Sequence, residues 1–175
     1  MPKGPEIRPS PDKVKQAIFS SLGESVAGAR VLDLYTGTGA LGLEALSRGA
    51  SEAVMVDNSR FSVEAALANA EKAGLADNAE VIRSDAIGYL ERALPNDRKF
   101  DIILADPPYE KTPSRKGSVT RLLLNCPGLA SILAVNGVLV MEHFMKDTLE
   151  PPLHWELRRQ LRHGDTTISF LYPKS

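Results

Sequence analysis

Apolar runs and polar turns alternate along this chain after its first two dozen residues. Short apolar runs bounded by Gly, Pro or Asp predict buried strands, and longer stretches with apolar residues three or four apart predict helices. This alternation is typical of an α/β fold with a mostly parallel sheet. The expected strands are 31–35, 53–57, 80–84, 101–105 and 137–142, and the expected helices are 40–48, 59–73, 86–93 and 119–133.

Both ends of the chain depart from that alternation. Residues 155–161 and 166–172, joined by a tight turn at 162–165, predict a final antiparallel hairpin. Residues 13–22 predict a helix with one apolar face, for which Ser10 or Asp12 can serve as the cap. We expect this helix to pack over the ligand end of the sheet or along its edge.

Composition limits the class of protein. The chain has 175 residues, 43% of them hydrophobic, which predicts one soluble domain: 1–23 as a mobile arm and helix, and 24–175 as the main body. Lys and Arg (21) nearly balance Asp and Glu (22), so a nucleic-acid partner would need a local basic patch. The single cysteine, Cys126, excludes an internal disulfide and is typical of a reducing cytoplasm. We expect a cytoplasmic protein without signal peptide or membrane span.

The turn Asp106-Pro107-Pro108-Tyr109 directly follows the apolar run 100–105. Consecutive prolines fix φ and lack an N–H, which stiffens the turn and leaves its carbonyls without local partners. A carboxylate and a carbonyl can accept both protons of a planar amino group while an aromatic ring stacks on its heterocycle. The pattern predicts group transfer to the exocyclic nitrogen of a nucleobase. The structural alternative is an ordinary Asx-Pro turn whose Tyr covers the sheet end.

A glycine-rich turn joins the first expected strand to the next helix. Residues 37–42 fit the pattern G-x-G-x-x-G, in which glycines let a ligand approach the backbone at a helix N-terminus. Asp57 ends the second strand, where a carboxylate can accept ribose hydroxyls, or can simply be a solvated strand end. These two features alone leave an NAD-dependent oxidoreductase open.

Asp33 favours a different cofactor. It lies within an apolar strand, where a carboxylate is costly unless it serves a partner. A negative charge there would repel the pyrophosphate of a dinucleotide and attract the ammonium group of S-adenosylmethionine, although Asp33 can also simply bond loop amides. After the third strand, Asp85 can accept from an adenine amino group with the Ala86 amide facing a ring nitrogen, or it can cap the next helix.

The two motifs meet if the sheet is doubly wound. Ligands of such sheets bind at the carboxyl ends of the strands, where the strand order reverses. The glycine loop leaves the first strand and Asp106 leaves the fourth, which would be its neighbour at that point. A methyl donor on the first strand would then face an amino acceptor on the fourth.

Three segments resemble the RsmD family of small-subunit ribosomal RNA methyltransferases. They are residues 31–49, Arg8-Pro9-Ser10 together with 14–19, and Asp106-Pro107-Pro108-Tyr109. The similarity runs in order through about residues 6 to 172. The Asp-Pro-Pro-Tyr element is also shared with many other amino-methyltransferases, including DNA adenine enzymes.

The resemblance implies a Rossmann-like class I methyltransferase with a seven-stranded, mostly parallel sheet, helices on both faces and a C-terminal antiparallel hairpin. It implies methyl transfer from S-adenosylmethionine, leaving S-adenosylhomocysteine, to guanine N2 of 16S rRNA in the small ribosomal subunit. Asp106, Pro107, Pro108 and Tyr109 would hold the guanine. Asp33, Gly37 and Gly39 would line the methionine moiety, Asp57 the ribose, and Asp85 and Ala86 the adenine; Tyr35, Thr36 and Asn58 would complete the cofactor site, and Ser10 would lie in a segment closing over it.

The chain departs from the family pattern near its beginning. Family members usually carry a basic β-hairpin before the Arg-Pro-Thr segment, which is absent here, and Lys15 and Gln16 replace the usual Arg and acid. Contact with RNA would then rest on local basic residues, although a solvated face is the alternative. The first candidates follow the catalytic turn, and a second group lies near the tail: Lys111, Arg115, Lys116 and Arg121, then Arg158, Arg159 and Arg162.

Other functions remain open on sequence grounds. A DNA or RNA adenine-N6 methyltransferase would use the same chemistry, and a non-catalytic cofactor-binding assembly module would keep only the fold. Three scattered histidines give no ligand spacing, so we expect no metal, and a structural role is favoured for His143. We expect a monomer.

Overall fold

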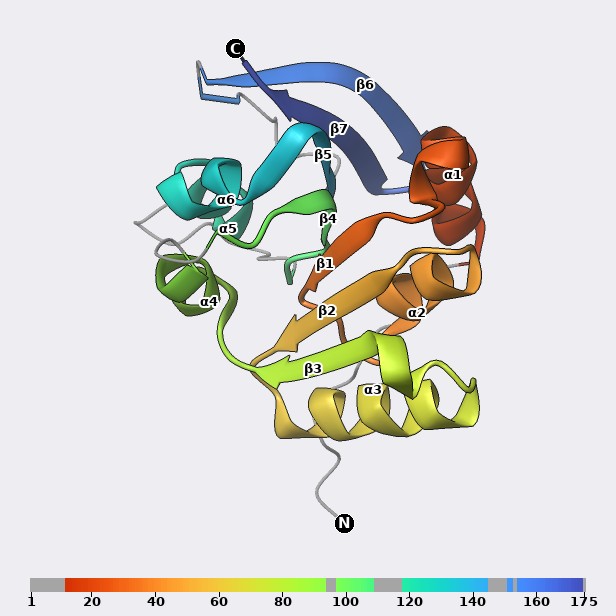
Figure 1. The fold of residues 1–175 in the computed structure, drawn as a ribbon. Coiled ribbons are helices and arrows are strands. Elements are labelled where there is room, and N and C mark those ends of the chain that lie inside the picture. Colours follow the sequence, from red (N-terminus) through yellow and green to blue (C-terminus); the bar gives the residue numbers. More distant parts are fainter. Residues whose placement is uncertain (1–11, 94–96, 109–117, 145–150, 153, 175) are drawn as a thin grey trace.

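The computed structural model describes residues 12–93, 97–108, 118–144, 151–152 and 154–174, so the expected N-terminal arm lies outside it. Helices and strands alternate through most of these residues (Figure 1). The helices are α1 (Asp12–Leu22), α2 (Ala40–Ser47), α3 (Arg60–Lys72), α4 (Ala86–Ala93), α5 (Val119–Leu124) and α6 (Pro127–Ser131), with short 3-10 turns η1 (Gly23–Val26) and η2 (Ala76–Asn78). The strands are β1 (Arg30–Leu34), β2 (Glu52–Asp57), β3 (Ala79–Arg83), β4 (Phe100–Ala105), β5 (Leu133–Phe144), β6 (Trp155–His163) and β7 (Thr166–Pro173).

The strands form one seven-stranded sheet in the order β3-β2-β1-β4-β5-β7-β6. Strands β1 to β5 pair in parallel, whereas β7 pairs antiparallel with both β5 and β6. The chain builds outward from β1 to β3 and then returns to the other side of β1 with β4, so the order reverses between β1 and β4. The predicted fold class, including the final antiparallel hairpin, is confirmed.

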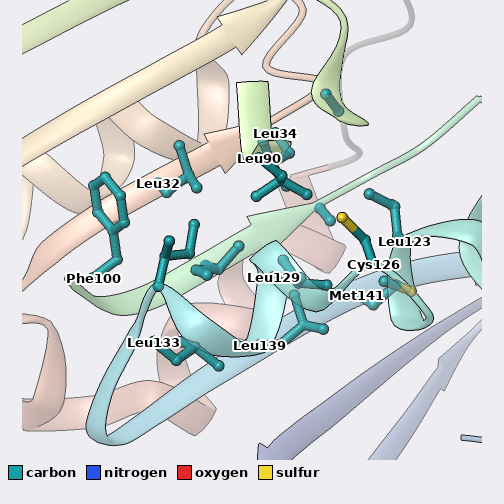
Figure 2. Close-up of a cluster of buried hydrophobic side chains, with 14 of the residues drawn as sticks. Leu32, Leu34, Leu90, Phe100, Leu123, Cys126, Leu129, Leu133, Leu139 and Met141 are labelled. Atoms are coloured by element: carbon teal, nitrogen blue, oxygen red, sulfur yellow. The ribbon is translucent and has the colours of Figure 1, made fainter. Parts of the chain in front are cut away.

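Two apolar clusters cover the two faces of this sheet, because strand side chains alternate between faces. One cluster joins Leu32 and Leu34 of β1 to Leu90 of α4 and Leu129 of α6, as Figure 2 shows. Trp155 of β6 is buried in the same cluster, and its Nε1 donates to the Leu124 carbonyl at 2.9 Å. The other cluster packs α1 and α2 on the opposite face.

Helix α1 packs on a face of the sheet beside α2. Sequence analysis predicted a position over the ligand end of the sheet or along its edge. Val14, Ile18 and Leu22 form its buried stripe, which joins the cluster that contains Ile102 and Val140. Such a stripe needs a continuous apolar surface, and the face provides one.

The predicted single helix 119–133 is wrong, because the structure breaks it into α5 and α6. Pro127 has no N–H and restricts the residue before it, and Cys126 accordingly takes an extended conformation between the two helices. Strand β5 also begins at Leu133, earlier than predicted, with a register shift against β4. The last turn is tighter than expected: only Gly164 and Asp165 separate β6 from β7.

Candidate active site

The two predicted motifs lie on neighbouring strands. Strands β1 and β4 pair in parallel through Leu34 and Ala105, their last residues. The glycine-rich loop therefore starts beside the turn that begins at Asp106, at the point where the strand order reverses (Figure 1). This confirms the predicted adjacency of the two motifs.

The glycine-rich loop bends back on itself before α2 begins. Tyr35 directly follows β1 with φ of 60°, so the strand ends one residue earlier than predicted, and Gly37 and Gly39 have φ of 58° and 86°. A tyrosine in this left-handed region is uncommon, and such conformations gather at functional sites. Gly39 precedes the first residue of α2 without a side-chain cap, and its amide donates to the Thr36 carbonyl at 2.9 Å.

Asp33 is the buried anchor of this loop, with 1% of its surface exposed. Its Oδ2 accepts the Thr36 hydroxyl at 2.7 Å and the Gly42 amide at 2.9 Å. Burial raises the pKa of the Asp33 carboxyl to about 7, although the two hydrogen bonds lower it. The nearby charges of Asp106 and Asp57 raise this pKa further. Sequence analysis left open a structural role in bonding loop amides; the structure shows a related one, in which Asp33 binds a loop hydroxyl and an amide of the first turn of α2.

Gly42 is a site residue that the sequence argument used only as part of a motif. A Cβ there would lie 2.7 Å from the Met55 Sδ and 3.2 Å from the Asp33 Oδ2. The third glycine of G-x-G-x-x-G thus serves close packing between α2 and β2, and the Asp33 carboxylate, which accepts its amide, takes the place of a side-chain cap.

Asp57 holds the second side of the loop. Its Oδ2 accepts the Gly37 amide at 2.9 Å, and its Oδ1 accepts the Ser59 amide at 2.9 Å, just before α3. Each carboxylate oxygen has two lone pairs, so both retain capacity for a ligand hydroxyl. Asn58 is exposed beside it, and its carbonyl accepts from the Arg83 Nε at 3.3 Å.

Asp85 caps α4, which is one of its two predicted roles. Its carboxylate accepts the Ile87 amide at 3.2 Å and the Gly88 amide at 3.0 Å, while Ala86 is buried as the first helical residue.

Tyr35, directly after β1, is influenced by the acids at the ends of β2 and β3. Burial raises the pKa of its hydroxyl to about 12, and the charges of Asp85 and Asp57 add to this effect.

The proline turn continues β4 toward the same edge. Asp106 is half-buried, Pro107 is buried and Pro108 is exposed, while Tyr109 lies outside the described residues. On the neighbouring strand β5, His143 is buried with its Nε2 2.8 Å from the Ser169 Oγ. That contact agrees with the structural role favoured for His143.

The predicted RNA contacts divide between the described and the undescribed parts of the chain. Lys111, Arg115 and Lys116 lie outside the described residues, as does Ser10 of the predicted cofactor site, and Arg121 is exposed in the last turn of α5. In the tail group, Arg158 binds Glu156 and lies 4.1 Å over the Tyr172 ring. Within the described ranges, no group of three His, Cys, Asp or Glu is arranged to hold a metal, and no helix is long and apolar enough to cross a membrane.

The strand order, the glycine-rich loop after β1 and the acids at the ends of β2 and β3 define a class I methyltransferase fold. Comparison with solved structures agrees. A putative methyltransferase, yhhF from Escherichia coli, superposes with a TM-score of 0.77 and 27% sequence identity over 97% of this chain and 90% of that one.

The family model described as "Conserved hypothetical protein 95" matches residues 1–172, and the chain belongs to this family. The "Putative rRNA methyltransferase YlbH" of Bacillus subtilis is 36% identical over 80% of this chain and 73% of its own length. The "Ribosomal RNA small subunit methyltransferase D" of Escherichia coli K12 is 32% identical over 91% of this chain and 76% of its own length. The predicted RsmD-like relationship is therefore confirmed.

Proposed function

We propose that this chain is an S-adenosylmethionine-dependent methyltransferase of ribosomal RNA, and that its target is the exocyclic N2 of a guanine in 16S rRNA. The observation that carries the proposal is the pairing of β1 with β4. It puts a loop suited to a methyl donor beside a turn suited to an amino acceptor. The names of the two relatives support rRNA as the substrate, and one of them supports the small subunit.

The residues at the carboxyl edge fit the cofactor. Asp57 offers acceptors for ribose hydroxyls, and Asp85 and the backbone at Ala86 offer an edge for adenine. Asp33 places a carboxyl with a pKa of about 7 below the loop, and its ionised form suits a cationic ligand and opposes a pyrophosphate. This argues against the NAD-dependent oxidoreductase considered from the sequence.

The proline turn would prepare the acceptor. An aryl amine is a poor nucleophile because its lone pair is delocalised into the ring. The Asp106 carboxylate and the Pro107 carbonyl would accept both amino protons, which directs the nitrogen lone pair at the methyl group that the bound cofactor supplies. Holding the two reactants in line can lower the barrier by ~7–11 kcal/mol. Asp106 would then receive or relay the proton that the methylated nitrogen loses.

The target base must first leave its stack, which costs a few kcal/mol. In the proposal Tyr109 stacks on the extruded base, and the basic residues after the turn contact phosphates. Because only modest basicity is available, a preassembled small subunit is the favoured substrate over naked RNA.

The test is methyl transfer from labelled S-adenosylmethionine to small subunits, large subunits, naked 16S rRNA and duplex DNA, followed by nucleoside analysis. We expect label in N2-methylguanosine from small subunits and its loss in Asp106→Ala. Label in N6-methyladenine would move the protein to the adenine class, and label only in large subunits would overturn the substrate. A function that persists in cells carrying Asp106→Ala would favour the assembly module.

A further inference from the structure

Asp33 and Asp106 place two carboxylates at the point where the strand order reverses. Asp33 lies on β1 opposite Leu104 of β4, and Asp106 follows two residues later. Along β4, Asp106 continues the row of Ile102 and Leu104, whose side chains share a cluster with Val31 of β1. Extending the alternation of side chains along β4 by one residue puts Asp106 on the face of Asp33, and the charge of Asp106 acts on Asp33.

Neutral groups alone hold Asp33 in the described part of the chain. Its hydrogen bonds there come from the Thr36 hydroxyl and the Gly42 amide, both to Oδ2. The charged groups that act on it, Asp57 of β2 and Asp106 after β4, are both acids. A buried carboxylate in such surroundings gains most from a positive charge that a ligand brings.

We propose that Asp33 and Asp106 form a charge-reading pair that makes the site favour the positively charged methyl donor over the product with its neutral sulfur. The inference rests on the proposed function. It adds that methyl transfer itself weakens the hold of the site on its ligand.

The reaction changes the charge of the bound ligand, and this change is what the two carboxylates distinguish. The bond from sulfur to the methyl carbon breaks as the bond from N2 to that carbon forms, so sulfonium becomes neutral thioether and the amine loses one proton. Donor and product share the ammonium, carboxylate, ribose and adenine groups. The ratio of their dissociation constants therefore reports one methyl group and one charge.

The experiment is calorimetric titration of the purified chain at pH 8 with S-adenosylmethionine, S-adenosylhomocysteine and sinefungin, which carries an amine in place of the methyl sulfonium. A unit charge about 6 Å from a carboxylate, at an effective dielectric constant of about 60 between those of protein and bulk water, corresponds to about a fivefold change in affinity. We expect the ratio Kd(product)/Kd(donor) to fall about fivefold in Asp33→Asn and again in Asp106→Asn, with sinefungin following the donor.

Asp85→Asn is the matched control. It removes a carboxylate from the adenine end of the site, and Asn preserves the helix cap. We expect all three ligands to weaken together in this variant, with the ratio unchanged.

The outcomes separate the two proposals. If none of the three ligands binds the wild-type chain, the proposed function fails. If they bind and the ratio is the same in wild type, Asp33→Asn and Asp106→Asn, the charge-reading pair is overturned while the methyltransferase stands. Two variants are used because either one alone can fail to fold, which circular dichroism would reveal.

Proton release gives a second readout. At pH 7 a cation bound near Asp33 should expel part of the proton that this carboxyl holds, since its pKa lies at about 7. Titrations in buffers with different ionisation enthalpies should show more protons released by the donor than by the product, and equal release in Asp33→Asn. Equal release in the wild type would contradict the pair.

Discussion

Asp101 and Asp33, at the two edges of the parallel sheet, have pKa values shifted in opposite directions. At the amino edge, Asp101 of β4 binds Arg30 of β1 through both carboxylate oxygens, at 3.1 and 3.2 Å. Hydrogen bonding from Arg30 lowers the pKa of Asp101. At the carboxyl edge of the same β1–β4 pair, burial raises the pKa of Asp33. One edge pairs its acid with an arginine, whereas the buried Asp33 carboxyl at the other edge accepts a hydroxyl and an amide and is harder to ionise.

The neighbouring strands repeat this difference. Glu52 and Glu80, at the starts of β2 and β3, both bind Arg98, at 3.2 and 3.0 Å. Asp57, the last residue of β2, instead accepts the Gly37 amide of the loop after β1 and the Ser59 amide. Asp85, after β3, accepts amides of the first turn of α4. The position of an acid on a strand therefore distinguishes a structural ion pair from a candidate site residue more clearly than the residue type does.

The largest expected effect comes from exchanging acids at the two ends of β4. Asp106→Asn should lower methyl transfer by about 10²–10³-fold, because the amide cannot receive or relay the proton that the methylated nitrogen loses. Asp101→Asn, at the other end of the strand, should leave the rate within about twofold. Single-turnover assays at saturating cofactor measure both rates, and equal losses would contradict the functional difference between the two edges.

The next largest effect is on the pH dependence of the free energy of unfolding. The pKa of Asp33 lies at about 7 in the fold and 3.8 in its ordinary state, so the folded protein holds a proton that the unfolded chain loses. This contribution is fully present below about pH 4 and is lost as the pH rises toward 7, on the order of 4 kcal/mol in total.

Asp33→Asn should remove that loss, since the amide does not titrate and can still accept a hydrogen bond. Urea unfolding from pH 4 to 8 should show the variant gaining on the wild type as pH rises. A wild-type advantage that grows with pH would show that Asp33 is stabilised as an anion.

A smaller effect is expected where α2 meets β2. Gly42→Ala would put a Cβ 2.7 Å from the Met55 Sδ, so the Met55 side chain or α2 must shift. We expect a loss of about 1–3 kcal/mol, as for other overpacked sites, and a smaller loss when Gly42→Ala is introduced into a Met55→Ala background, which removes the clash. Thermal unfolding of the single and double variants checks this, and an unchanged melting temperature in Gly42→Ala would refute the close packing.

The smallest effect concerns the ion pair at the amino edge. The Arg30 and Asp101 side chains remain 42% and 38% exposed, so Asp101→Asn should cost only about 1 kcal/mol at pH 7. Because its folded pKa is lowered, this contribution is present above about pH 4 and is lost in acid, opposite in direction to that of Asp33. Urea unfolding in low and high salt should show the difference shrinking with salt.

Much of the fold followed from the sequence because hydrophobic period and turn residues agree locally. The apolar run before Asp106 correctly predicted β4, and the G-x-G-x-x-G pattern correctly predicted a loop that leads into α2. The single helix predicted at 119–133 is wrong, because Pro127 has no N–H and separates two helices despite the continuous apolar spacing.

The site was predictable in its placement and less so in its bonding. Parallel strands bring their carboxyl ends to one edge, so the proximity of Asp33 and Asp106 could be inferred. The left-handed conformation of Tyr35 and the Asp33 contact with the Gly42 amide depend on how the loop folds in three dimensions. No local pattern in the sequence specifies either.

The most direct test of the central claim is an NMR titration of the ¹⁵N-labelled chain with S-adenosylhomocysteine. The account predicts shifts of the Gly37, Gly39, Ser59 and Gly88 amides at the carboxyl edge, with the Arg30 amide at the amino edge unchanged. Shifts centred on Arg30 and the β2 and β3 starts, with a silent glycine loop, would contradict it.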